Sequence, residues 1–107
     1  MGGATTEQVI QNLKRLKSEL ARQFEIDHFI IFGSRARGDE LLTSDADLLV
    51  VSDVFRGQKF ADRPSRVLEY WDDLVDLEVL CYPRSEFMEL KERLGIVRRA
   101  VQEGVEL

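Results

Sequence analysis

The stretch that decides the fold is GSRARGDELLTSDADLLVV, residues 33–51. It begins with the glycine spacing of a phosphate-binding Walker loop, because Gly33 and Gly38 are five residues apart. However, Asp39 and Glu40 stand where that loop needs Lys followed by Ser or Thr. The sequence therefore excludes a P-loop nucleotide hydrolase, and a phosphate held here needs another source of positive charge.

The second half of this stretch places two carboxylates at the start of an apolar strand. Asp45 and Asp47 are two residues apart, so in a strand they share one face at a spacing of about 6.6 Å. Two bare charges at that spacing repel by about 2–3 kcal/mol at an effective dielectric of about 20. Mg²⁺ bound by a few carboxylates and by substrate phosphates would remove this repulsion. The alternative is that the pair only caps the strand in water.

Two apolar runs flank the connection. HFIIF, residues 28–32, predicts a buried strand that stops at Gly33, and ADLLVV, residues 46–51, predicts a second one. A connection this short favours antiparallel pairing, because the end of the first strand then lies beside the start of the second. We therefore expect Gly33 and Ser34 to face the carboxylates.

Such a turn can hold a phosphate. Gly33 lets the backbone come close to a ligand, the following N–H groups attract anions, and the Ser34 hydroxyl can donate to a phosphate oxygen. Arg35 and Arg37 could add positive charge for a polyphosphate, with plain solvent exposure as the alternative.

The rest of the chain alternates helical and strand patterns without a linker or repeat. We expect helices over roughly residues 6–24, 64–74, 83–94 and 96–103, a loop over 53–63, and a third strand, VDLEVLCY, over 75–82. This order predicts an α/β (α+β) fold in which a small mixed sheet of about three to four strands is flanked by helices. Residues 1–107 are expected to form a single domain.

Composition limits the function. The chain has 15 basic and 20 acidic residues and a net charge of −5, which argues against nucleic acid as the main ligand. Its apolar runs are far too short for a membrane span, and its N-terminus lacks the apolar core of a signal peptide, so we expect a cytoplasmic protein. The single cysteine, Cys81, lies in an apolar run and is expected to be a buried, reduced thiol.

The third strand carries a further acidic pair. Asp76 and Glu78 share a face of the expected strand, so periodicity does not choose between them as a third carboxylate of the site. In the preceding loop, Lys59 and Arg63 could reach a triphosphate, but we expect both at the solvated surface.

Gly33-Ser34, ten intervening residues and Asp45-x-Asp47 resemble the signature of the polymerase-beta nucleotidyltransferase superfamily. The wider stretch 33–51 looks like its minimal, stand-alone prokaryotic branch. The apolar-acid-apolar VDL at residues 75–77 lies where that family places its third carboxylate, and the resemblance covers roughly residues 25–92.

The resemblance implies a mixed sheet that presents three acids to two Mg²⁺ ions and a nucleoside triphosphate such as ATP. By position, Asp45 and Asp47 would bind both metal ions, while Asp76, favoured over Glu78 by the family pattern, would bind the catalytic ion and help to deprotonate a hydroxyl acceptor. Gly33 and Ser34 would hold the terminal phosphates. The implied reaction is in-line attack on the α-phosphorus, which releases pyrophosphate.

The resemblance also implies partners. Members of the minimal branch are often encoded beside a HEPN-type ribonuclease toxin, which the catalytic subunit, acting as antitoxin, adenylylates. The chain shows no second domain to hold an acceptor, so a protein partner or a homodimer is expected to complete the site. The alternative function is a non-catalytic antitoxin or regulatory subunit that acts by contact alone.

Overall fold

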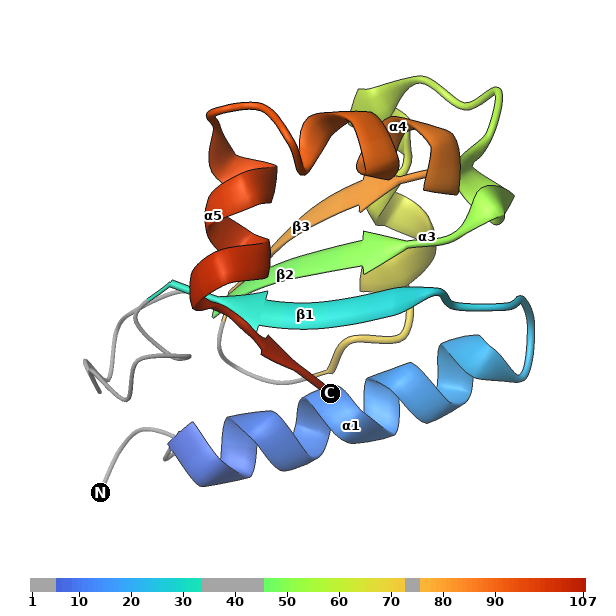
Figure 1. The fold of residues 1–107 in the computed structure, drawn as a ribbon. Coiled ribbons are helices and arrows are strands. Elements are labelled where there is room, and N and C mark those ends of the chain that lie inside the picture. The colour runs from blue at the N-terminus through green and yellow to red at the C-terminus, as the bar shows by residue number, and fades with distance from the viewer. Residues whose placement is uncertain (1–5, 34–45, 73–75) are drawn as a thin grey trace.

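Four strands form one mixed sheet with helices on both faces in the computed structural model, which describes residues 6–33, 46–72 and 76–107 (Figure 1). The strands are β1 (His28–Phe32), β2 (Ala46–Val51), β3 (Leu77–Tyr82) and β4 (Val105–Glu106), in the order β3-β2-β1-β4. β1 and β2 are antiparallel, as predicted, and β2 and β3 are parallel. The predicted fold class is therefore confirmed.

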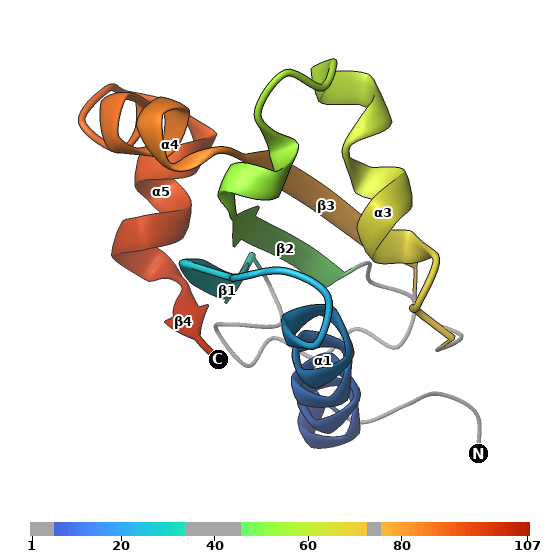
Figure 2. The same cartoon turned by 90° about the vertical axis from the view of Figure 1, so that its right-hand side faces the viewer.

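Helix α1 (Thr6–Ala21) covers one face of this sheet (Figure 2). Its apolar residues recur with helical period and are almost fully buried, namely Val9, Leu13, Leu16 and Leu20. Full burial of each such side chain contributes about 1.5–3 kcal/mol. The predicted helix was three residues too long at its C-terminus, because the chain leaves the helix after Ala21. Phe24 still packs against the same core.

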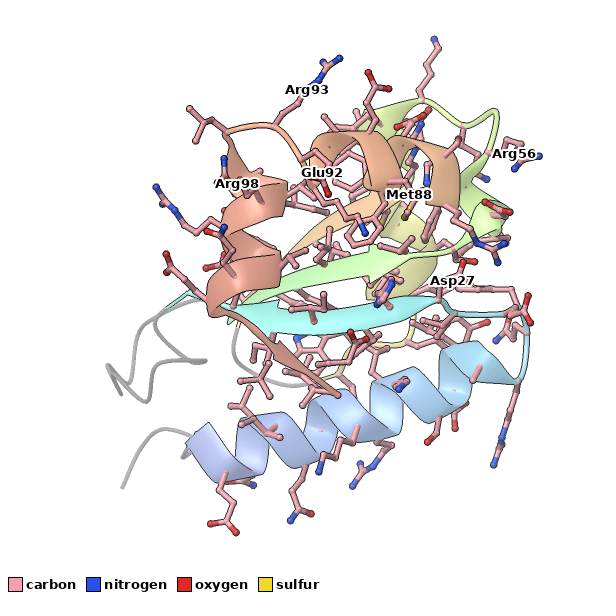
Figure 3. All side chains as sticks on the ribbon, viewed as in Figure 1. Asp27, Arg56, Met88, Glu92, Arg93 and Arg98 are labelled. Atoms are coloured by element: carbon pink, nitrogen blue, oxygen red, sulfur yellow. The ribbon has the colours of Figure 1, made fainter. Side chains whose placement is uncertain are left out.

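Helices α4 (Arg84–Leu90) and α5 (Ile96–Glu103) lie on the opposite face. Side chains fill the space between each helical layer and the sheet (Figure 3). The core of this second layer is smaller, with Leu49 and Val51 of β2 packed with Phe87 of α4 and Val97 of α5. Among the described residues, no helix has the length and hydropathy needed to cross a membrane.

The connection from β2 to α3 (Pro64–Leu68) contains two short 3-10 helices and a buried arginine. The expectation that Arg63 is solvated was wrong, since its side chain is only 7% exposed. It donates to the carbonyl oxygens of Gln58 and Cys81 and forms an ion pair with Glu86 at 3.1 Å. Because these three partners satisfy the guanidinium, Arg63 ties the loop to β3 and α4. Lys59 is exposed, as expected.

Helix α3 begins at Pro64 as predicted but ends at Leu68 rather than near residue 74. Trp71, which follows this helix, is partly buried against the core. Residue 74 lies outside the described residues.

The C-terminal third differs from the prediction in two places. Helix α4 ends at Leu90 rather than at residue 94, and Leu94 is 90% exposed. Gly95, whose φ is +154°, separates α4 from α5 as predicted. The two residues of β4 were not predicted individually, although a fourth strand was within the expected range. Glu106 holds β4 to β1 by accepting the backbone N–H of Phe29.

Candidate functional site

The glycine that ends β1 lies directly against a carboxylate of β2. Gly33 has a φ of +82°, a conformation that residues with a side chain rarely adopt. A Cβ atom built on Gly33 would clash with Oδ2 of Asp47 and lie 3.4 Å from its Cγ. The strand register explains this contact, because Phe32 is the partner of Asp47 across the antiparallel pair. Gly33 thus lies beside Asp47, the second acid of the D-x-D pair, as expected for this turn.

A second carboxylate lies on the other side of Asp47. Asp47 and Glu78 are partners in the parallel register between β2 and β3, so their side chains leave the sheet on the same face. Both line one cavity of about 320 Å³, together with Phe32, Pro64, Leu80 and Ile96. Asp47 is half-buried and makes contacts within the protein, whereas Glu78 is exposed. The sheet therefore arranges glycine, aspartate and glutamate across three successive strands.

Asp76 directly precedes β3 and is exposed. The predicted third strand began at residue 75, but the observed strand begins at Leu77, so Asp76 lies just outside it. Its place at the beginning of β3 is at the same end of the sheet as the beginning of β2, because these two strands are parallel.

The other predicted site residues lie outside the described residues. These are Ser34, Arg35, Arg37 and Asp45. Thus Gly33 and Asp47, of the predicted set, are brought into contact, and Glu78, the alternative third acid, joins Asp47 at the cavity.

The donors at this place suit a hard divalent cation. Carboxylate oxygens are the ligands that Mg²⁺ takes in proteins. Gly33 leaves the space above Asp47 free of a side chain. Within residues 6–33, 46–72 and 76–107, no group of three Asp, Glu, His or Cys residues is close enough to hold a metal ion. Asp45, the third predicted ligand alongside Asp47 and Asp76, is not among those residues.

Cys81 on β3 is not a nucleophile. It is a free, fully buried thiol, as predicted. Burial raises the pKa of Cys81 to about 12, and the nearby positive charge of Arg63 opposes part of that rise. Since the thiolate is the reactive form, the thiol is inert at neutral pH.

Two features of this region could not be predicted from the sequence. The apolar wall of the cavity combines Leu80 of β3 with Ile96 of α5, which are 16 positions apart in the sequence. The burial of Arg63 depends on Cys81 and Glu86, which also come from later elements. The only local sequence feature near Arg63 is that it directly precedes Pro64, the first residue of α3.

Comparison with known proteins agrees with this arrangement. Residues 13–107 match the model of the nucleotidyltransferase domain family. The fold is similar to the crystal structure of a provisionally assigned nucleotidyltransferase from Sulfolobus solfataricus, with a TM-score of 0.63 and 28% sequence identity over 99% of this chain and 89% of that chain. Among curated proteins, no significant match was found.

Proposed function

Because the chain belongs to the nucleotidyltransferase domain family, we propose that it transfers a nucleoside monophosphate, AMP from ATP, to a hydroxyl acceptor. The contact between Gly33 and Asp47 carries this proposal. It joins the two halves of the G-S and D-x-D signature, which are separated by ten residues of sequence, at one end of the sheet.

In this proposal Asp45, Asp47 and Asp76 hold two Mg²⁺ ions, and these ions supply charge stabilisation for the entering and leaving oxygens when bound. The backbone at Gly33 and the hydroxyl of Ser34 bind the terminal phosphates, with added charge from Arg35 and Arg37.

The chain's own residues then position the reactants. Asp76 accepts the proton of the acceptor hydroxyl. The acceptor oxygen forms a bond to the α-phosphorus as the bond to the bridging oxygen breaks, and pyrophosphate leaves with the electron pair. Positioning and charge stabilisation supply most of the rate enhancement in such reactions.

The acceptor in this proposal is a hydroxyl of a partner protein, of which a HEPN-type toxin encoded beside the gene is the first to test. Resemblance to the minimal branch supports this choice. A homodimer that completes the site, and an antitoxin that acts by contact without transfer, are the competing outcomes of the same test.

The test uses the purified chain with Mg²⁺, α-labelled ATP and the product of the adjacent gene. We expect label on the partner with the wild type and none with the double variant Asp45→Asn/Asp47→Asn. Asp27→Asn is the matched control, since Asp27 lies at the opposite end of the sheet and pairs with Arg84 at 2.8 Å (Figure 3). A wild-type chain that neither labels an acceptor nor binds ATP in the presence of Mg²⁺ would refute the enzymatic proposal. ATP binding and partner binding without transfer would support the antitoxin that acts by contact.

A further inference from the structure

The cavity beside Asp47 spans strands β1, β2 and β3, and most of its strand residues are on β3. Asp47 is on β2, between Gly33 at the end of β1 and Glu78 on β3. The cavity of about 320 Å³ extends over β3 and is lined by Glu78 and Leu80 there. The two sides of Asp47 thus differ in degree. On the β1 side Gly33 touches Asp47 and only Phe32 lines the cavity, whereas three consecutive residues of β3, from Glu78 to Leu80, line it on the other side.

This asymmetry matches what in-line transfer requires. The attacking oxygen and the leaving pyrophosphate must lie on opposite sides of the α-phosphorus. If the terminal phosphates bind at Gly33, as in the proposed function, the acceptor approaches from the β3 side. The cavity is at that position.

The walls of the cavity are mostly apolar. Phe32, Pro64, Leu80 and Ile96 contribute carbon surface, and Ile96 at the start of α5 is 51% exposed, so that this wall lies next to solvent. A volume of about 320 Å³ is at the lower end of the range typical of small-molecule sites, roughly 300–1,000 Å³. The cavity therefore suits a compact group with an apolar skeleton.

Glu78 adds a charge to these walls. Within the described part of the chain, its carboxylate has neither an ion pair nor a hydrogen bond. An amine on the acceptor would give Glu78 a charge-assisted hydrogen bond, which a neutral acceptor would not.

We infer that this cavity is the acceptor site and that Glu78 selects an acceptor in which the reacting hydroxyl stands near a cationic amine on an apolar skeleton. This inference rests on the nucleotidyl transfer of the proposed function, and its small acceptor is an alternative to the partner protein proposed there. In this inference Glu78 selects the acceptor, and Asp76 stays the third metal ligand.

The experiment compares two alcohols as acceptors, 2-amino-3-phenylpropan-1-ol and 2-methyl-3-phenylpropan-1-ol. The first carries an ammonium group at the position where the second carries a methyl group. Pyrophosphate release is measured with Mg²⁺ and ATP in the wild type, in Glu78→Gln and in the control Glu92→Gln. Glu92 lies after α4, outside the cavity lining (Figure 3). We expect the wild type and Glu92→Gln to prefer the amino alcohol at least tenfold in kcat/KM. Glu78→Gln should lower that preference at least tenfold, through KM for the amino alcohol.

A second variant tests the cavity without changing its charge. Ile96→Trp replaces a half-exposed side chain at the start of α5 and should raise KM for both alcohols at least fivefold, while KM for ATP stays the same. Thermal melting checks that each variant is folded.

Three results would overturn the inference. An unchanged preference in Glu78→Gln would show that Glu78 does not contact the acceptor. Loss of transfer to both alcohols in Glu78→Gln would make it a metal ligand. A wild type that binds ATP in the presence of Mg²⁺ but uses neither alcohol would exclude this acceptor class. If instead ATP binding itself does not depend on Mg²⁺, it is the proposed function that fails.

Discussion

Gly33 and Asp47 lie so close across the pairing of β1 and β2 that a Cβ atom at Gly33 would fall on Oδ2 of Asp47. We therefore expect Gly33→Ala to lose at least 100-fold in kcat/KM for nucleotide transfer, because the carboxylate must move from its position. The added side chain is also strained at a φ of +82°, which costs about 1–2 kcal/mol of folding stability. Steady-state kinetics and urea unfolding measure the two effects separately.

Gly57→Ala is the control for this variant. Gly57 has nearly the same φ, +81°, but a Cβ atom there would have no heavy atom within 4 Å. It should lose a similar amount of stability and keep its activity. Equal losses of activity in both variants would mean that stability, rather than the Asp47 carboxylate, explains the effect at Gly33.

Asp76→Asn should lower kcat by about 10²–10⁴-fold, the range typical of removing a general base. The binding of ATP should change much less, because Asp45 and Asp47 keep their charges. Isothermal titration with Mg²⁺ and a non-hydrolysable ATP analogue measures the binding, and pyrophosphate release measures kcat. If Asp76→Asn keeps near wild-type kcat while Glu78→Gln loses it, the third catalytic acid is Glu78.

Arg63→Met should destabilise the fold by about 1–3 kcal/mol, the usual cost of leaving buried hydrogen-bonding groups without a partner. The guanidinium is buried, and its loss leaves the carbonyl oxygens of Gln58 and Cys81 without this donor. Glu86→Gln should cost less, because the Glu86 side chain is 46% exposed and water can replace part of its role. Urea unfolding of the two variants compares them, and equal small losses would show that Arg63 contributes no more than a surface residue.

The central part of the fold could be predicted from the sequence because its signals are local. Apolar runs define β1 and β2, and the short connection between them sets their antiparallel pairing and hence the approach of Gly33 to Asp47. Helix α1 followed from the periodicity of its buried leucines.

What failed depends on contacts between distant elements. Helical period continued to Leu94, but α4 ends at Leu90 and leaves Leu94 90% exposed. Arg63 looked like loop surface until β3 and α4 supplied its partners. The cavity wall that joins Leu80 to Ile96 has no sequence pattern at all, because it arises only when α5 lies against the sheet.

The free energy of unfolding should depend on pH above about pH 9, because the Cys81 thiol ionises in the unfolded state but not in the folded state. Its pKa in the folded protein is raised from 9.0 to about 12 by burial, so the native thiol stays protonated while the unfolded thiol ionises above pH 9. The unfolded state then binds fewer protons, and stability falls with pH by up to about 1.4 kcal/mol per unit in that window.

Cys81→Ala lacks this titration, whereas the raised pKa of the neighbouring Tyr82 is present in both proteins and largely cancels. In urea unfolding the stability advantage of the wild type over Cys81→Ala should therefore be constant from pH 7 to about 8.5 and shrink from about pH 9 to 10.5. Parallel stability curves over the whole range would mean that the native thiol ionises as readily as the unfolded one.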